Sequence, residues 1–204
     1  MGFYSRQLQP RLLNVTMAAG TKEIRDRVCA GLRSDVVEIG YGSGLNQPHL
    51  PPEVDGVSAV EPSPVALQLA TARRAASGVA VVVAGTDAQR MDLPDDSFDA
   101  ALCTWTLCGI PDPAAALREV RRVLRPGGVL HFVEHGLAPD ENVRRWQHRL
   151  EPAQKRLFGG CHLTRPVADL VRAGGFTITE LDSFYEDGTP KVLGASSLGT
   201  ARPS

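Results

Sequence analysis

The sequence lacks an excess of charge of either sign and has few aromatic residues. Its 204 residues include 22 Lys and Arg against 23 Asp and Glu, and aromatic residues make up only 5%. A protein that binds nucleic acid by neutralising phosphates needs a basic surplus, and one that stacks bases needs aromatic side chains. The sequence therefore predicts no nucleic-acid partner.

A long apolar run is also missing. No stretch reaches the roughly 18 uncharged apolar residues of a membrane helix, and the N-terminal MGFYSRQLQPRLLNV has no apolar core of a signal peptide. Gly2 begins a myristoylation pattern, but Arg6 occupies the position where Ser or Thr is needed. We therefore expect no membrane insertion and a cytoplasmic location.

Paired cysteine motifs are absent as well. The four cysteines are Cys29, Cys103, Cys108 and Cys161. None forms a CxxC pair, which argues against a zinc ribbon or a redox motif and favours reduced, mostly buried thiols. His131 and His135 stand four residues apart without a Cys or carboxylate pattern beside them. The sequence therefore predicts no metal site.

What is present is a regular alternation of apolar runs and helical patterns. Residues 3–32 are predicted to be helical with a break near Gly20, after which Thr21 would cap a second helix. The predicted strands are 35–40, 56–60, 79–83, 98–104, 129–134, 176–181 and 192–198, and the later helices are 64–76, 113–124, 142–158 and 165–173. Strands separated by helices predict a mostly parallel sheet.

The last two strands are predicted to be antiparallel, because the turn signal at residues 186–188 joins them directly. The chain length fits one α/β domain, residues 1–204. Within it, residues 1–32 form a helical N-terminal extension and residues 139–174 a helical insert between the fifth and sixth strands.

The strongest chemical signal is a glycine-rich turn at the end of the first strand, Glu38-Ile39-Gly40-Tyr41-Gly42-Ser43-Gly44. Such glycines let a ligand lie directly against the backbone beyond the strand ends. A dinucleotide fingerprint would need a sixth-position glycine, where this chain has Leu45, and no Lys-Ser/Thr follows to form a phosphate loop. The turn is therefore poorly suited to a pyrophosphate.

Carboxylates follow the same edge of the predicted sheet. Glu38 precedes the first glycine and could meet an ammonium group, whereas Glu61 ends the second strand, where a carboxylate can accept both ribose hydroxyls. Asp87 and Ala88 follow the third strand. Acidic surroundings without a phosphate site predict a cationic nucleoside ligand.

Four segments carry a resemblance to a known family: VVEIGYGSGLN, AVEPSP, GTDAQRMDLPDDSFDAALCTWTLC and LREVRRVLRPGGVLHFVEHG. In order and spacing they resemble the motifs of class I S-adenosylmethionine-dependent methyltransferases. The resemblance implies a Rossmann-like open sheet of seven strands in the order 3-2-1-4-5-7-6, with strand 7 antiparallel and helices on both faces. It also implies S-adenosyl-L-methionine as cofactor and S-adenosyl-L-homocysteine as product.

The resemblance places the methionine part of the cofactor beside Glu38 and the glycines, the ribose at Glu61, the adenine at Asp87 and Ala88, and the methyl group near Cys103 and Thr104. The full set expected to bind the cofactor is Glu38, Gly40, Tyr41, Gly42, Gly44, Asn46, Glu61, Pro62, Asp87, Ala88, Cys103 and Thr104.

The downstream half, with GGCHLTR after the charged helix, resembles a small-molecule branch that includes alkyl-thiol S-methyltransferases. This chain lacks the apolar N-terminal anchor of the animal members of that branch. A small-molecule thiol is the favoured acceptor, and Tyr4, Leu107 and Trp146 are candidate substrate-binding residues. A thiolate needs little base catalysis, whereas a phenol, quinone or other small acceptor would need a base, for which His135 is the candidate.

Two functions of other classes are weighed against methyl transfer. A nicotinamide-dependent oxidoreductase is disfavoured by the misplaced third glycine and the lack of a Tyr-x-x-x-Lys pair. A non-catalytic cofactor-binding protein is compatible with the sequence, because this family needs no invariant catalytic residue. The sequence does not predict the oligomeric state.

Overall fold

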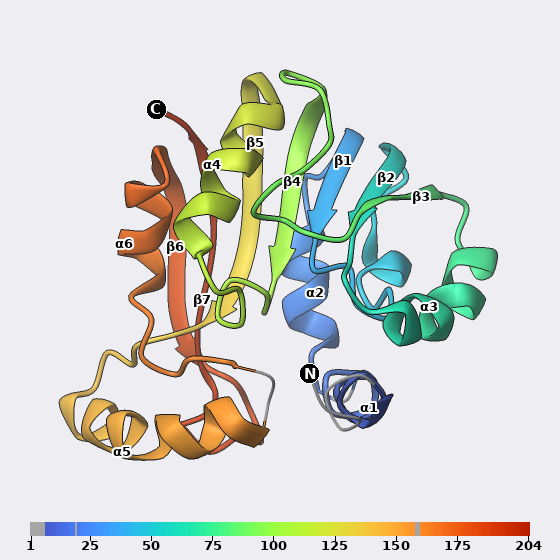
Figure 1. Cartoon of the computed structure of the whole chain (residues 1–204). Coiled ribbons are helices and arrows are strands. Elements are labelled where there is room, and N and C mark those ends of the chain that lie inside the picture. Colours follow the sequence, from blue (N-terminus) through green and yellow to red (C-terminus); the bar gives the residue numbers. More distant parts are fainter. Residues whose placement is uncertain (1–6, 19, 158–159) are drawn as a thin grey trace.

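The computed structural model describes residues 7–18, 20–157 and 160–204. The described chain forms one seven-stranded sheet with the order β3-β2-β1-β4-β5-β7-β6 (Figure 1). Its strands are β1 (Ser34–Ile39), β2 (Val54–Val60), β3 (Ala80–Gly85), β4 (Phe98–Thr104), β5 (Leu124–His135), β6 (Phe176–Tyr185) and β7 (Ala195–Pro203). The first five strands are parallel, and β7 pairs antiparallel with both β5 and β6. The predicted fold class and strand order are confirmed.

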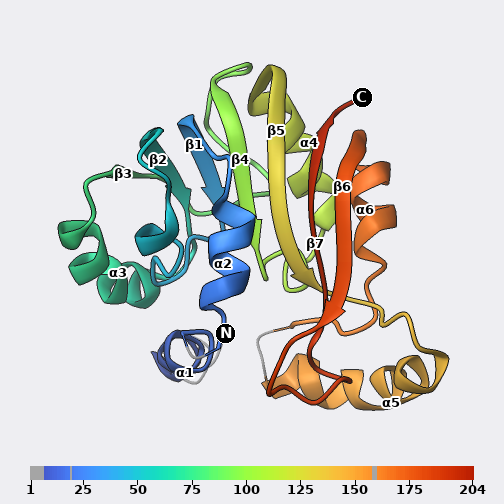
Figure 2. The ribbon, with the colours of Figure 1, turned by 180° about the vertical axis from the view of Figure 1, so that it is seen from behind.

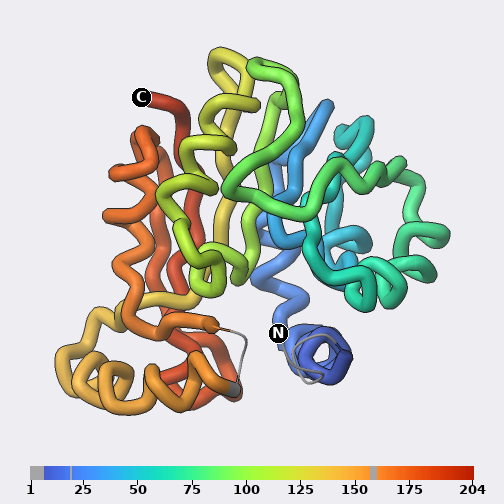
Figure 3. Tube along the Cα trace, in the orientation of Figure 1, coloured from blue at the N-terminus to red at the C-terminus, as the bar shows by residue number. Residues whose placement is uncertain are grey.

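Helices lie on both faces of this sheet and beyond one of its edges. They are α1 (Gln9–Thr16), α2 (Lys22–Cys29), α3 (Pro64–Ala76), α4 (Pro113–Val123), α5 (Glu141–Leu157) and α6 (Val167–Ala173), with the short η2 (Gln47–His49). Figure 1 shows α4 and α6 in front of the sheet, and Figure 2 shows α2 on the opposite face. In Figure 3, α1 and α5 lie beyond the carboxyl ends of the central strands.

Local sequence signals account for several helix starts. The Ser63 hydroxyl accepts a hydrogen bond from the Ala66 amide at 3.2 Å, and Pro64 opens α3. Asp112 caps α4 in the same way, accepting from the Ala115 amide at 2.9 Å. Thr21 is the N-cap residue of α2, as predicted, but its side chain makes no capping bond, because its hydroxyl donates to the Met17 carbonyl at 2.5 Å.

The C-terminal strands differ from their predicted bounds. The last strand begins at Ala195 rather than 192, because backbone bonds from Leu193 and Gly194 to the Pro190 carbonyl, at 2.8 and 3.0 Å, form a turn there. It then continues to Pro203, since it lies between two strands that extend its hydrogen bonding. The preceding helix α6 begins at Val167, after Pro166, rather than at 165.

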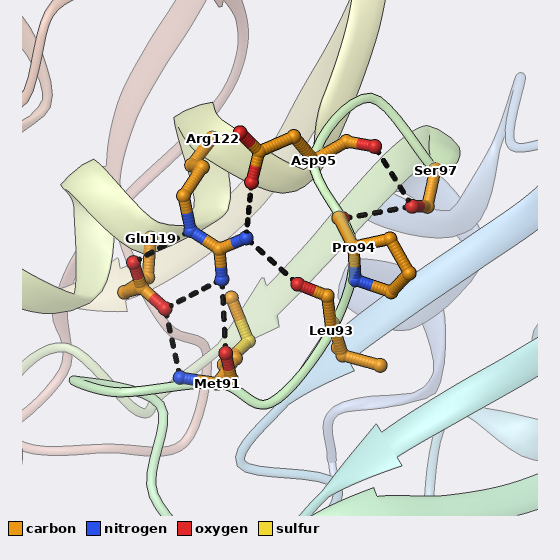
Figure 4. A network of polar contacts seen from close by, with 7 residues as sticks. All are labelled: Met91, Leu93, Pro94, Asp95, Ser97, Glu119 and Arg122. Atoms are coloured by element: carbon orange, nitrogen blue, oxygen red, sulfur yellow. Dashed lines mark hydrogen bonds and ion pairs between the residues drawn. The ribbon is translucent and has the colours of Figure 1, made fainter.

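The loop between β3 and β4 is held by Arg122 of α4 (Figure 4). The guanidinium donates to the carbonyls of Met91 and Leu93 at 2.9 and 2.7 Å and pairs with Asp95 at 2.6 Å and Glu119 at 2.8 Å. Glu119 in turn accepts from the Met91 amide at 2.8 Å, and its pKa is lowered chiefly by the bond from Arg122. This network fixes the loop that carries the predicted adenine residues.

None of the helices in the described ranges is long and apolar enough to cross a membrane.

Candidate active site

The glycine turn follows β1 at the carboxyl edge of the sheet. Gly40, Gly42 and Gly44 have φ of +71°, +58° and +71°, the left-handed region that favours glycine. A Cβ at Gly40 would collide with the side chain of Thr106, and one at Gly44 would lie 2.8 Å from the Tyr41 hydroxyl. The turn therefore packs directly against the loop that follows β4.

Glu38 lies beneath this turn with an unpaired oxygen. Its side chain is buried, and Oε1 accepts from Asn46 Nδ2 at 2.8 Å. Oε2 is the buried side-chain polar atom in the described residues that has no hydrogen-bond partner. Burial raises the pKa of Glu38 to about 8. A buried carboxyl oxygen without a donor is uncommon, and the ammonium group of a ligand would supply the missing bonds.

Arg25 of α2, which no sequence motif indicates, lies against the same network. The buried guanidinium donates to Asn46 Oδ1 at 2.5 Å and lies 4.8 Å from the centre of the Trp105 ring. Burial lowers its pKa to about 10. Asn46 also donates to Thr104 Oγ1 at 3.0 Å, so α2, the turn and β4 are connected. The only sequence signal was an arginine beside Ile24 within an apolar helix face.

Glu61 holds the turn from the second strand. One carboxyl oxygen accepts from the Gly42 amide at 2.7 Å and the other from the Ser63 amide at 2.8 Å. The carboxyl group is buried, which raises its pKa. Each oxygen keeps a lone pair for a hydroxyl donor, which is what the predicted ribose site requires.

The remaining predicted cofactor residues differ in their surroundings. Pro62 is exposed, whereas Ala88 is buried in the loop after β3. Asp87 is solvent-exposed, and bonds from Gln89 lower its pKa. Cys103 is buried with its thiol 3.2 Å from Glu134 Oε1, and burial raises the pKa of that thiol. These assignments to the cofactor stay predictions.

Glu134, near the end of β5, fixes the loop after β4. Its carboxylate accepts from the backbone amides of Thr106, Leu107 and Cys108 at 2.8, 3.0 and 3.1 Å. Burial raises the pKa of this carboxyl group. The loop begins at Trp105, which has a φ of +47°, an unusual backbone conformation for a bulky residue. A carboxylate that bonds three consecutive amides explains how this conformation is held.

His135 ends β5 beside two sulfur atoms. Its Nε2 lies 3.2 Å from Glu186 Oε1, which also accepts from Trp105 Nε1 at 3.0 Å. Burial lowers the pKa of His135, but the contacts with Cys161 and Glu186 outweigh it and raise the pKa to about 9. Cys161 lies 3.3 Å from Cys108, sulfur to sulfur, and this contact is the largest cause that lowers the pKa of Cys161 to about 5.

The three residues predicted to bind substrate lie in different surroundings, and one of them is outside the described residues. Tyr4 lies outside the described residues. Leu107 is buried in the core cluster against α4, next to the residues that Glu134 holds. Trp146 is 55% exposed on α5, with the Arg149 guanidinium 5.2 Å from its ring centre. The roles of these residues in substrate binding, and of His135 as a base, stay predictions.

Three features define the class of this protein: the sheet order with its antiparallel seventh strand, the glycine turn, and the acids Glu38 and Glu61 at the carboxyl ends of β1 and β2. The class is that of the Rossmann-like methyltransferases. The sequence profile described as "Methyltransferase domain" matches residues 37–132. A solved S-adenosylmethionine-dependent methyltransferase of Thermotoga maritima, described as a possible histamine N-methyltransferase, has a TM-score of 0.67. It is 24% identical, and the match covers 98% of this chain and 97% of that chain.

The chain is also similar in sequence to proteins named as thiol S-methyltransferases. The chain is 32% identical over 166 residues to thiol S-methyltransferase TMT1B of Rattus norvegicus, covering 78% of this chain and 67% of that protein. It is 38% identical over 136 residues to the Homo sapiens protein of that name, covering 64% and 54%. The chain thus spans between about half and two thirds of these relatives' length. It belongs to the class I S-adenosylmethionine-dependent methyltransferase family.

Proposed function

We propose that this protein transfers the methyl group of S-adenosyl-L-methionine to the sulfur of a small-molecule thiol. The observation that carries the cofactor assignment is the unpaired Oε2 of buried Glu38, in a network that also contains buried Arg25. The amino-acid end of the cofactor has an ammonium group and a carboxylate. A buried carboxyl group near a buried guanidinium is complementary to both.

The chain's own residues bind and orient the cofactor. Glu38 would accept from its ammonium group, Glu61 from its ribose hydroxyls, and the glycine turn would let it approach the backbone. The bound cofactor supplies an electrophilic methyl group, which is the chemistry that the protein itself lacks. The contribution of the protein is then orientation, which converts a two-molecule reaction into one of fixed geometry.

The thiol acceptor is supported by the relatives, which are named as thiol S-methyltransferases. A thiolate is a strong nucleophile and needs no strong general base. A cytoplasmic location stays a prediction.

The test is a methyl-transfer assay with S-adenosyl-L-methionine against thiols, phenols and hydroquinones of similar size. We expect thioether formation with one equivalent of S-adenosyl-L-homocysteine, and little transfer to oxygen. Turnover of a phenol or hydroquinone with no reaction of any thiol would replace the proposal by the O- or C-methyltransferase alternative, for which His135→Ala should abolish activity. Binding of S-adenosyl-L-homocysteine without turnover of any acceptor would favour a non-catalytic cofactor-binding protein.

A further inference from the structure

Three side chains with metal-binding atoms meet beside the loop that follows β4. Cys108 comes from that loop, His135 from the end of β5, and Cys161 from the segment after α5. The two sulfur atoms are 3.3 Å apart, and one ligand atom from each residue lies within 4.8 Å of the others. Two sulfurs and an imidazole nitrogen are the donor types of zinc sites in proteins.

We propose that Cys108, His135 and Cys161 bind a Zn²⁺ ion whose fourth position receives the sulfur of the acceptor thiol. The inference rests on the proposed function and gives its substrate a binding site. In a tetrahedral site with Zn–S bonds of about 2.3 Å, ligand sulfurs stand roughly 3.8 Å apart. The observed sulfur pair needs to separate by only about half an ångström, which side-chain rotation supplies.

The surroundings of His135 match those of a metal ligand. Its Nε2 faces Glu186 at 3.2 Å, which leaves Nδ1 as the nitrogen available to an ion. The Glu186 carboxylate is itself oriented by Trp105 Nε1 at 3.0 Å and Ser196 Oγ at 2.7 Å. A ligating histidine in proteins almost always donates its second nitrogen to such a group, which fixes the ring.

Hydrogen bonds to the backbone hold the segments of the two cysteines next to each other. Glu134 accepts from the Cys108 amide at 3.1 Å, and the His162 amide donates to the Cys108 carbonyl at 2.9 Å. The Arg165 guanidinium donates to the Leu107 carbonyl. The segment that carries Cys161 is thus anchored to the loop that carries Cys108, although 53 residues separate the cysteines.

The loop that carries Cys108 also touches the predicted cofactor site. Thr106, two residues before Cys108, packs directly against Gly40 of the glycine turn. Three protein ligands leave an open fourth position, the arrangement of catalytic rather than structural zinc sites. An ion there would lie one short loop away from the predicted position of the methionine part.

The reaction balances with the ion as a binding site for sulfur. The acceptor R–SH takes the fourth position and releases its proton to water, because a coordinated thiol is deprotonated. The sulfur then forms a bond to the methyl carbon. The bond from that carbon to the sulfonium sulfur breaks, and its electron pair stays on that sulfur. The products are a neutral thioether, which is a poor ligand and leaves, and S-adenosyl-L-homocysteine.

The experiment measures metal content of the full chain purified with a phosphine reductant. We expect about one Zn²⁺ per chain for the wild type and less than roughly a tenth of that for Cys108→Ser and Cys161→Ser. Cys29→Ala is the matched control, because Cys29 is a buried free cysteine of α2 outside the cluster. It should keep the metal. Calorimetry with S-adenosyl-L-homocysteine shows that each variant is folded.

A second readout tests the fourth position. In protein loaded with Co²⁺ in place of Zn²⁺, the sulfur-to-metal absorption should change when a small thiol is added and should not change with the matching alcohol. Chelation should lower thiol methylation at least about tenfold and leave S-adenosyl-L-homocysteine binding intact.

The outcomes separate the two proposals. Full thiol methylation by metal-free protein would overturn the zinc site and leave the proposed function standing. If the protein bound zinc but methylated no thiol, the metal site would be supported. The proposed binding of the acceptor thiol to that zinc, and the proposed function, would both be overturned. A third outcome is a disulfide between Cys108 and Cys161, detected by mass spectrometry without reductant. If the reduced protein then also took up no zinc, the metal site would be overturned.

Discussion

The two halves of the sheet hold their ligand-binding residues in different ways. On the β1–β3 side, the two carboxyl groups bond residues fewer than 20 positions away: Glu38 with Asn46, and Glu61 with Gly42. On the β4–β7 side, they join residues far apart, such as Trp105 with Glu186 and Cys108 with Cys161. The cofactor half is therefore encoded locally as a motif, whereas the acceptor half depends on the folded chain.

The largest effect should come from Glu134, which we place as the positioning residue of the acceptor half. Glu134→Ala leaves three backbone amides without their acceptor, so the free energy of unfolding should fall by about 2–4 kcal/mol. Thiol methylation should decrease far more than S-adenosyl-L-homocysteine affinity. Urea denaturation and calorimetry measure the two effects.

The exposed Glu141→Ala on α5 is the control for that variant and should be nearly neutral. If Glu134→Ala lost cofactor affinity first and kept its turnover rate, the division between the two halves would be wrong.

The next effect concerns the cofactor half. Glu38→Ala should weaken S-adenosyl-L-homocysteine binding about 10- to 100-fold, because it removes a charge-assisted bond to the ammonium group. The exposed Glu53→Ala is its control and should bind as the wild type does. Unchanged affinity in Glu38→Ala, measured by calorimetry, would show that the unpaired oxygen does not meet the ligand.

The protonation of Glu38 can also be tested without a ligand, by measuring the stability of the protein as a function of pH. The pKa of Glu38 is about 8 in the folded protein against an ordinary 4.5, so between those values the folded state keeps a proton that the unfolded state has lost. The stability from this group is present below pH 4.5 and is lost as pH rises towards 8. Burial raises this pKa most, the hydrogen bond from Asn46 and then the charge of Arg25 lower it, and the charge of Glu61 raises it.

Glu38→Gln cannot ionise, so its stability relative to the cofactor-free wild type should increase with pH. The gain should approach about 1.4 kcal/mol per pH unit at most. Denaturation at pH 5, 6, 7 and 8 measures it. A difference between variant and wild type that does not change with pH would mean that Glu38 is ionised in the folded protein.

The smallest effect is expected at Trp146. Because its side chain is 55% exposed, Trp146→Ala should change the free energy of unfolding by less than about 0.5 kcal/mol. The KM for the thiol should stay within about twofold, since a solvated ring contributes little to burying a ligand. Steady-state kinetics check this. A several-fold increase in KM would instead support the sequence-based assignment of Trp146 to the acceptor site.

The difference between the halves also explains what the sequence could predict. Apolar runs, the alternation of strands with helices and the glycine turn are local signals, and with the family resemblance they predict the sheet and the set around Glu38 and Glu61. Arg25 gave no signal, because its role depends on α2 packing against the turn.

The cluster at Cys108 escaped the sequence analysis for the same reason. Each cysteine looked isolated, and His135 was paired in sequence with His131, whose ring instead contacts the Val28 carbonyl at 3.0 Å. The prediction of no metal site depends on the spacing of that histidine pair and of the cysteines, and neither spacing brings residues 108, 135 and 161 together. Only the pairing of β4, β5 and β7 and the segment after α5 does so.

Calorimetric titration of the wild-type protein with S-adenosyl-L-homocysteine and, separately, with NADH tests whether the glycine turn binds a nucleoside cofactor. The buried carboxyl group, the glycine turn and the absence of a phosphate motif predict one binding site per chain for the nucleoside and none for the dinucleotide. No heat with millimolar S-adenosyl-L-homocysteine, together with saturable binding of NADH, would contradict the account.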